Sequence, residues 1–414
     1  MRRPIVVCTT LSLAALTLAP GAVSSQSPAS GWDPSAITGT VTLSGWESSQ
    51  AEGEALQATL DGFAAAYPNI TVDYQPIPGN YVEAMSANFA ARDVPDLFYV
   101  NADVAPEWIK EGYLLPLDDR IAASGFDTSH FFPGAADVFK GEDGQTYGFP
   151  KDFNTIGMAY NTSLVPTPPA TLEELVTTAE GLVGAEGVQA PLCLNPGLDR
   201  GLAFLYAQGG SLLTEDGTAS AIDTEASTAA VQWYLDLFKN GLGKTAAEMG
   251  AGWCGDALGQ GLSAMTFEGG WLDPAMTSTY PDIAYAWAPV PTGSSGSPET
   301  ISFTASYSIG ADAANPDPAF VLLTYLTGVD GMTSWTEGGV ALPSRDDVPQ
   351  PAGKEVLAGL SSVARPGAGF MPGYATVQKA FGDEFINQIQ SGTYDAAPVV
   401  AATKAAIDSA LAPA

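Results

Sequence analysis

The sequence predicts an α/β protein made of two domains, each with its own sheet. Its 414 residues are too many for one ordinary hydrophobic core and suggest two domains of about 150–200 residues each. Strand and helix signals alternate as far as the turn Gly141–Gly144 and then begin again. Between the two runs, the stretch Tyr147–Asn161 contains Pro150, which interrupts a regular strand. We therefore expect this stretch to be a hinge, with a ligand held in the cleft beside it.

The composition is strongly acidic. The chain has 15 Lys and Arg against 46 Asp and Glu, which gives a formal net charge of −31 and a pI of about 4.1. Because phosphate binding needs clustered Lys and Arg, neither nucleic acid nor an anionic membrane surface is expected as a partner. We interpret the acidity as an aid to solubility, for instance in a salty medium.

The N-terminus has the three regions of a secretory signal peptide, predicted at residues 1–24. Arg2 and Arg3 supply the charge, residues 5–19 are apolar, and residues 20–24 are small or turn-forming. The apolar run is short for a membrane span, and Cys8 lies inside it, which does not support a lipid anchor. Residues 25–36 are expected to be a flexible tether. The exported protein is expected in the periplasm or at the extracellular face of the cytoplasmic membrane.

The first half of the mature chain has the order β-α-β-α-β. Strands are predicted at residues 40–44, 70–74 and 97–100, and helices at residues 51–67 and 81–92. This order implies a parallel sheet with right-handed crossovers, whose ligands bind beyond the carboxyl ends of the strands. The residues just past two of those ends are Trp46 and Glu47, and then Asn101 and Asp103.

The second half begins a second, independent run of strand and helix signals. Thr171 and Glu174 have the spacing of a capping box at a helix start, and residues 212–221 are predicted to form a hairpin. Asp199 and Arg200 follow a short strand signal. Further strands are predicted at residues 192–194, 262–267 and 302–309, and further helices at residues 316–326, 331–336 and 377–389.

Cysteine and histidine usage restricts the chemistry. Removal of the signal leaves Cys193 and Cys254, and an even pair in an exported chain favours a disulfide, the alternative being two buried free thiols. His130 is the only histidine, so we interpret it as a packed loop residue rather than a catalytic group or a metal ligand. The sequence contains no nucleophile motif, zinc-ligand spacing, phosphate loop or dinucleotide fingerprint. No cofactor, metal or catalytic residue is therefore predicted.

Large aromatic side chains stand beside polar planar groups at several predicted strand ends and at the hinge. The groups are Trp46 with Glu47, Phe153 among Lys151, Asp152 and Asn154, and Trp271 with Glu268. Sugars need this combination, because their C–H faces stack on rings while carboxylates and amides take hydroxyls in pairs. Core packing explains each tryptophan taken alone, and a solvated loop explains each carboxylate. Their joint occurrence after successive strands favours a carbohydrate site.

Five sequence blocks, in this order, resemble the extracellular solute-binding proteins that feed sugars to bacterial ABC importers, in the group of maltose-binding protein. The resemblance covers residues 37–411, nearly the whole mature chain. The blocks are FAAAYPNITVDY (63–74), VPDLFYVNADVAPEWIKEGYLLPLDD (94–119), GQTYGFPKDFNTIGMAYNTSLV (144–165), AMTFEGGW (264–271) and FMPGYATVQKAFGDEF (370–385).

The resemblance implies a two-lobed, type II periplasmic-binding-protein fold. Each lobe would be a mixed, mostly parallel sheet flanked by helices, and the chain would cross between lobes near residues 149–154, 302–308 and 338–343. Lobe I would comprise residues 37–150 plus 306–340, and lobe II residues 151–305 plus 341–414. These boundaries make neither lobe continuous in sequence.

The resemblance also implies ligand contacts at matching positions. Trp271 matches the family's stacking tryptophan, Glu268 a polar neighbour, and Tyr374 an aromatic position in the C-terminal helical region. Polar contacts are implied at Asn101, Asp103, Asp199 and Arg200. Val100 stands where maltose-binding protein has a tryptophan, and the aromatic-rich loop of that protein is replaced at residues 197–202. These departures argue against specificity for malto-oligosaccharides.

The expected function is therefore that of a monomeric binding protein without catalysis. It would hold a carbohydrate, a di- or oligosaccharide, in the cleft and deliver it to membrane permease subunits by hinge closure. One alternative is a binding protein for a non-sugar solute such as a polyamine, which the acidity would suit. Others are a secreted glycoside hydrolase, for which the abundant carboxylates are only a weak signal, and a surface adhesion or signalling module.

Overall fold

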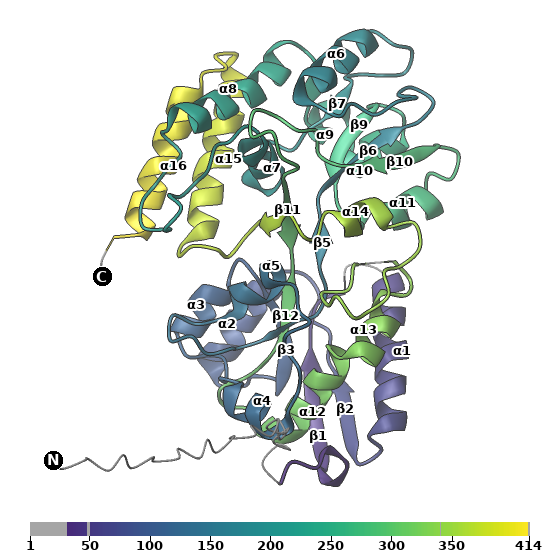
Figure 1. Ribbon diagram of the computed structural model, residues 1–414, viewed down its shortest axis with the longest axis vertical. Helices are drawn as coiled ribbons and strands as arrows, with labels where there is room; N and C mark the ends of the chain where they lie inside the picture. Colours follow the sequence, from purple (N-terminus) through teal and green to yellow (C-terminus); the bar gives the residue numbers. More distant parts are fainter. Residues whose placement is uncertain (1–30, 48–49, 340, 413–414) are drawn as a thin grey trace, which may run out of the picture.

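The chain forms two α/β lobes that lie one above the other in Figure 1. The computed structural model describes residues 31–47, 50–339 and 341–412. The predicted signal peptide and the first part of the predicted tether lie outside these ranges. Among the described helices, none combines the length and the apolar character needed to cross a membrane.

The lower lobe is built on a five-stranded sheet. Its strand order is β2 (Ile70–Tyr74), β1 (Gly39–Ser44), β3 (Leu97–Asn101), β12 (Ala305–Ile309) and β4 (Phe149–Pro150). β1 pairs in parallel with β2 and β3, whereas β12 runs antiparallel to β3 and β4. The predicted β-α-β-α-β order of the first half is therefore confirmed, and a strand from far along the chain completes the sheet.

Helices from the beginning and the late part of the chain cover this sheet. They are α1 (Gln50–Ala66), α2 (Tyr81–Ala91), α3 (Ala105–Lys110), α4 (Asp118–Ser124), α5 (Pro133–Ala136), α12 (Pro316–Leu326) and α13 (Val329–Thr336). α1 packs against α12 and α13. Phe63, on the predicted apolar face of α1, is fully buried next to the ring of Tyr325. The early and late segments therefore share one core.

The upper lobe has a second five-stranded sheet. Its strand order is β10 (Tyr285–Ala288), β6 (Gly157–Asn161), β9 (Met265–Glu268), β7 (Leu192–Cys193) and β8 (Gly243–Lys244). β6 is antiparallel to its two neighbours, and β7 is parallel to its own. Each sheet thus has as many antiparallel as parallel pairings, fewer parallel ones than expected. The reason is that β12 and β6 begin at the hinge and run away from it. Their neighbours β3 and β9 run towards the hinge, so each pair is antiparallel.

The upper lobe has more helices than the lower one. Its helices are α6 (Leu172–Leu182), α7 (Leu198–Ala207), α8 (Glu225–Lys239), α9 (Ala246–Met249), α10 (Cys254–Gly259), α11 (Leu272–Ser278), α14 (Glu355–Gly359), α15 (Tyr374–Ser391) and α16 (Ala396–Ala410). The C-terminal pair α15 and α16 packs against α8 (Figure 1). At the start of α6, Thr171 and Glu174 form the predicted capping box. The predicted hairpin at 212–221 is present as a single bridge between Leu213 and Ser220.

Three chain segments pass side by side between the lobes. The first runs from β4 to β5 (Asn154–Thr155), the second from β11 (Thr300–Phe303) to β12, and the third follows α13. β11 pairs with β5 and with β13 (Ala364–Pro366) in a small sheet between the two large ones. Phe153 and Leu342 exchange backbone hydrogen bonds of 2.9 and 2.8 Å, which join the first segment to the third. The crossings therefore form one connected hinge.

The end of the predicted tether is folded. Residues 34–36 form a 3₁₀ turn, which begins where the Asp33 side chain accepts a hydrogen bond from the Ser35 amide. The ring of Trp32 packs edge-on against Phe320 of α12, with 5.5 Å between ring centroids. Residues 31–36 are therefore not the flexible segment that their composition suggests, since Trp32 lies half-buried against the lower lobe.

Candidate functional site

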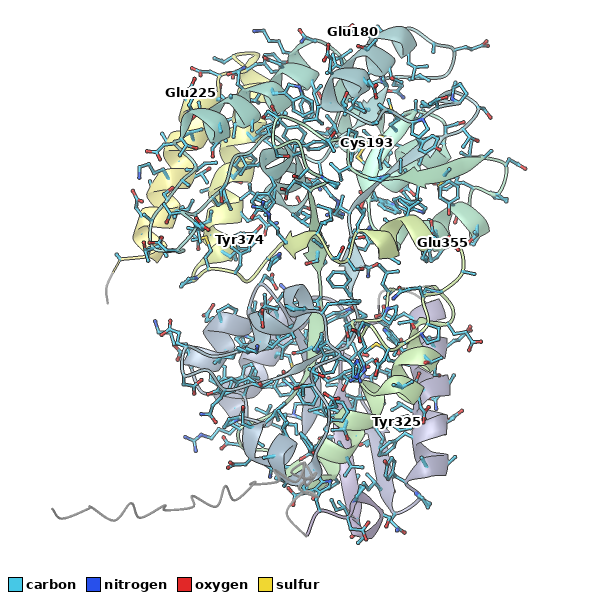
Figure 2. The ribbon with its side chains drawn as sticks, in the orientation of Figure 1. Glu180, Cys193, Glu225, Tyr325, Glu355 and Tyr374 are labelled. Atoms are coloured by element: carbon cyan, nitrogen blue, oxygen red, sulfur yellow. A yellow bond between two sulfur atoms is a disulfide. The ribbon has the colours of Figure 1, made fainter. Side chains whose placement is uncertain are left out.

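A cavity of about 600 Å³ lies between the two lobes at the hinge. It combines aromatic rings with carboxylates and amides drawn from both lobes and from the crossings. Tyr374, at the start of α15, lies on the edge of the upper lobe that faces the lower one (Figure 2). The lining includes Trp46, Glu52, Asn101, Asp103, Lys151, Asp152, Asn154, Trp253, Trp271, Phe303, Trp335, Tyr374 and Gln378.

The lower wall follows the ends of β1 and β3, as predicted. After β1, a Cβ on Gly45 would lie 2.4 Å from the ring of Tyr99, so only glycine lets the chain pass this ring. Trp46 then packs edge-on against Tyr81 and Tyr99 and lines the cavity. After β3 comes Asp103, whose carboxyl pKa is raised because burial removes it from water.

The floor of the cavity is a buried ionic cluster on the first crossing. The side chain of Lys151 is 3% exposed, and its Nζ lies 2.5 Å from Asp152 Oδ2 and 3.8 Å from Glu52 Oε1. The same ammonium stands 4.1 Å from the ring centroid of Trp335, whose Nε1 donates to Asp152 Oδ2. A buried lysine is tolerated only when paired in this way. The cluster ties α1 and α13 of the lower lobe to the hinge.

One polar atom in this floor lacks a partner. Asn154 Oδ1 is buried and accepts no hydrogen bond from the described residues. Asn154 lines the cavity, and Oδ1 lies close to Gly270 of the upper lobe, where an added Cβ would be 3.1 Å away. An unsatisfied buried acceptor costs about 1–3 kcal/mol, which a hydroxyl bound in the cavity would recover.

The upper wall is dominated by Trp271, which two charged side chains hold in place. Its Nε1 donates to Glu268 Oε2 at 2.9 Å, and Glu268 in turn pairs with Arg200 Nη2 at 2.6 Å. The Arg200 guanidinium lies 5.1 Å from the centroid of the Trp271 ring. Arg200 and Glu268 do not line the cavity between the lobes. They anchor the ring that does.

A second buried pair fixes the chain on the other side of Trp271. Lys354 Nζ pairs with Asp273 and donates to the backbone oxygen of Gly270 at 2.9 Å. Asp273 also accepts hydrogen bonds from Tyr285 Oη and Trp287 Nε1, at 2.5 and 2.9 Å. The loop that carries Trp271 is therefore held at both ends by ion pairs that few water molecules reach.

Cys193 and Cys254 are joined in a disulfide, in agreement with the prediction from the cysteine count. Cys193, at the end of β7, lies inside the upper lobe (Figure 2). Cys254 begins α10, directly after Trp253, which lines the cavity. The bridge therefore ties the start of α10, and with it Trp253, to the central sheet of this lobe.

Most of the sequence-predicted contacts meet in this cavity. Those that line it are Trp46, Asn101, Asp103, Lys151, Asp152, Asn154, Trp271 and Tyr374. Four do not line it: Glu47 is exposed, Asp199 accepts a hydrogen bond from Asn195, and Arg200 and Glu268 support Trp271. Contact of the lining residues with a ligand remains a prediction.

Sequence reasoning missed several lining residues because they follow no strand. Trp335 lies in α13 and Gln378 in α15, and Glu52 is in the first turn of α1. Trp253 could have been found from the sequence, because it directly precedes Cys254 of the predicted disulfide. A tryptophan next to a bridged cysteine is held firmly, as a stacking surface needs to be.

The chain matches the family model described as "Bacterial extracellular solute-binding protein" over residues 47–333. A curated binding protein of Brucella abortus (strain 2308) is 24% identical over 323 residues, which are 75% of this chain and 77% of that one.

Two solved structures share the fold over nearly their whole length. The GacH receptor of Streptomyces glaucescens, solved unliganded and with acarbose, has a TM-score of 0.78 and 25% identity, over 91% of this chain and 99% of that one. A substrate-binding protein of Listeria monocytogenes, in complex with cycloalternan, has a TM-score of 0.78 and 20% identity. The match covers 90% of this chain and 99% of that one.

Proposed function

Because the chain belongs to the bacterial extracellular solute-binding protein family, we propose that it is the substrate-binding component of an ABC importer for a carbohydrate. The observation that carries the proposal is the cavity between the lobes, where four tryptophans stand among carboxylates and amides. Rings for the C–H faces of a sugar and planar polar groups for its hydroxyls are the chemistry that carbohydrate recognition requires. The sugar ligands of the receptors from Streptomyces and Listeria support the same class of ligand.

The ligand would be a di- or oligosaccharide that bridges the two lobes. On the lower side, Trp46 stacks on it, and Asn101 and Asp103 accept its hydroxyls. Asn154 Oδ1 receives a further hydroxyl at the hinge, and Trp271 stacks from above. The lobes would be divided as the resemblance implies, residues 37–150 plus 306–340 and residues 151–305 plus 341–414, except that Arg345 and Val348 pack on the lower lobe.

Binding would drive the two lobes together about the three crossings. A ligand favours closure only through its higher affinity for the closed form, and a shift from 1:99 to 99:1 needs about 5.5 kcal/mol of that difference. Hydroxyl bonds to both lobes and two stacked rings supply contacts that exist only after closure. Permease subunits would then recognise the closed form of the monomeric, exported protein at the outer face of the cytoplasmic membrane.

The ligand would leave chemically unchanged. The family and the similar structures are binding proteins. Of the carboxylates in the cavity, Asp152 is paired with Lys151 and hydrogen-bonded to Trp335, so it is not placed as a free general base. Incubation with oligosaccharides should therefore release no new reducing ends, whereas a secreted glycoside hydrolase would release them.

A polyamine is the second candidate ligand, favoured by the charge of the cavity. Three carboxylates, those of Glu52, Asp103 and Asp152, line it together with one lysine. Putrescine and spermidine therefore belong in the same binding screen. If spermidine raised the stability of the folded protein and no sugar did, the ligand would be a polyamine and not a carbohydrate.

A thermal-shift screen against mono-, di- and trisaccharides tests the proposal. A ligand at 100 times its Kd stabilises the folded protein by about 2.7 kcal/mol, which a melting curve resolves easily. Trp271→Ala should weaken binding of the sugar so identified by about tenfold or more, because it removes a stacking surface. Trp271→Phe, which keeps a ring, is the matched variant and should retain most of the affinity. Equal affinity in the alanine variant and the wild type would remove Trp271 from the site.

A further inference from the structure

A second cavity, of about 720 Å³, lies in the upper lobe beside the first. Its walls come from the loop after β7, from α9, from the start of α10 and from the C-terminal half of α15. It is amphipathic, with Arg200, Glu248 and Gln390 among its polar groups and Ile386 and Tyr394 among its apolar ones. None of these residues lines the cavity between the lobes.

The two cavities are neighbours separated by a thin partition. Trp253 lines both of them. Trp271 lines the first, and the two side chains that hold it, Glu268 and Arg200, line the second. The hydrogen-bonded side chains of Trp271, Glu268 and Arg200 therefore stand between the two cavities, and Trp253 borders both.

Two features of the second cavity are unusual for a passive surface hollow. Ile386 is 37% exposed and is one of four exposed large hydrophobic residues in the described part of the chain; the other three line neither cavity. Tyr394 has a φ of +53°, and within the described residues only Arg92 shares a positive φ among non-glycine residues. A bulky side chain in this conformation is strained, and such strain gathers at functional sites.

The surrounding structure holds Tyr394 in this conformation. Its carbonyl accepts a hydrogen bond of 2.9 Å from Gln232 Nε2 of α8, and its amide donates to the Gln388 carbonyl of α15 at 3.3 Å. Tyr394 so placed lines the cavity together with polar groups that can bind hydroxyls. Exposed apolar carbon, an aromatic ring and charged or amide groups again provide the surface that a sugar unit fits.

We propose, on the basis of the function proposed above, that the ligand is an oligosaccharide of more than two units that occupies both cavities. One end is clamped between the lobes, and the chain continues past Trp253 so that the other end rests on Ile386 and Tyr394. Arg200 and Glu268 then serve two purposes, since they hold Trp271 on one side and face the sugar chain on the other. The second cavity thereby selects for chain length.

Calorimetric titrations with sugars of increasing length test this inference. The probes are the malto-, cello- and xylo-oligosaccharides of two to six units, titrated into the wild type and into two variants. Tyr394→Gly removes the ring and suits the positive φ, so it keeps the backbone conformation. Ile386→Ser removes the exposed apolar side chain, and Val183→Ser is its control, because Val183 is also exposed and lines neither cavity.

In the series that binds, we expect affinity to rise by about tenfold between the disaccharide and the longer members. Tyr394→Gly and Ile386→Ser should abolish this gain and leave the affinity for the disaccharide unchanged, and Val183→Ser should change neither. A disaccharide that binds as tightly as the hexasaccharide, or variants that weaken both equally, would overturn this inference and leave the proposed function intact. Failure of every saccharide to bind would overturn the proposed function and this inference with it.

Discussion

At the scale of single residues, the types of the site residues were readable from the sequence, but some of their roles were not. The pairing of an aromatic with a carboxylate predicted that Glu268 and Trp271 both contact the ligand. Glu268 holds the ring instead of lining the main cavity, because its carboxylate is taken by Arg200. Arg200 lies 68 residues from Glu268 in the chain, so no local sequence pattern predicts this pair.

Glu268→Gln should destabilise the protein by about 3 kcal/mol. The two side chains are 4% and 13% exposed, and loss of the Glu268 charge leaves the buried Arg200 with only the longer, 3.4 Å pair to Asp199 Oδ2. Urea denaturation measures the change in the free energy of unfolding. Asp383→Asn is the matched control: it breaks the exposed pair with Lys379 and should cost less than about 0.5 kcal/mol. Similar losses in the two variants would contradict the anchoring role of Glu268.

His130 should make a pH-dependent contribution to stability. Its pKa is raised above 6.5, chiefly by the hydrogen bond to Asp346 and also by Asp347 and Asp127, with Arg345 paired to Asp347 close by. The folded state thus holds the proton more tightly than the unfolded state. This contribution is complete below the ordinary pKa and disappears as the pH rises through the raised value. The sequence interpretation of a packed loop residue overlooked these carboxylates.

The difference in melting temperature between the wild type and His130→Gln should therefore be larger at about pH 5.5 than at about pH 8.5. Because the chain has one histidine, its imidazole resonance in a proton NMR titration reports this pKa directly. A measured value at or below 6.5, or a difference in melting temperature that grows towards alkaline pH, would contradict the assignment.

At the scale of elements, the sequence predicted the longer helices and the central strands, because periodicity and capping are local properties. The capping box of α6 and the buried face of α1 are examples. What failed depended on distant partners. Residues 31–36 have the composition of a tether, yet Trp32 finds Phe320 almost three hundred residues away along the chain. The equal mixture of strand directions likewise follows from where the chain crosses the hinge.

Removal of the disulfide by the double substitution C193A/C254A should cost about 4 kcal/mol of stability, because the bridge closes a loop of 61 residues. It should also weaken sugar binding, since Trp253 loses its fixed neighbour. Chemical denaturation and calorimetry measure the two effects in the same samples. A variant as stable as the wild type would contradict the structural role of the bridge, and unchanged affinity would contradict the positioning of Trp253.

At the scale of the whole molecule, chain length indicated two domains, and the resemblance implied how the chain is divided between them. The lower core combines residues from the beginning of the chain with residues from 307 to 348, and the upper core takes the middle and the end. Neither lobe is a continuous segment, which length and composition alone do not reveal. The position of the cavity between the lobes was predictable, because ligands of such sheets bind where the carboxyl ends of the strands meet.

Small-angle X-ray scattering should detect closure of the lobes. A saturating sugar should lower the radius of gyration, because the lobes approach each other around the ligand. The Trp271→Ala variant at the same sugar concentration should remain close to its unliganded value. An unchanged radius in the wild type, with binding confirmed by calorimetry on the same sample, would show that the ligand is held without hinge motion.

The position of β12 has a consequence for how this protein is made. This strand stands between β3 and β4, so the first sheet stays divided until synthesis has passed Ile309. A growing polypeptide therefore has no finished domain to fold early, although its N-terminal strands are produced first. For the export proposed above, such a delay would keep the chain unfolded enough to pass through a narrow secretion pore, and its tertiary structure would be completed only after nearly all of it had emerged.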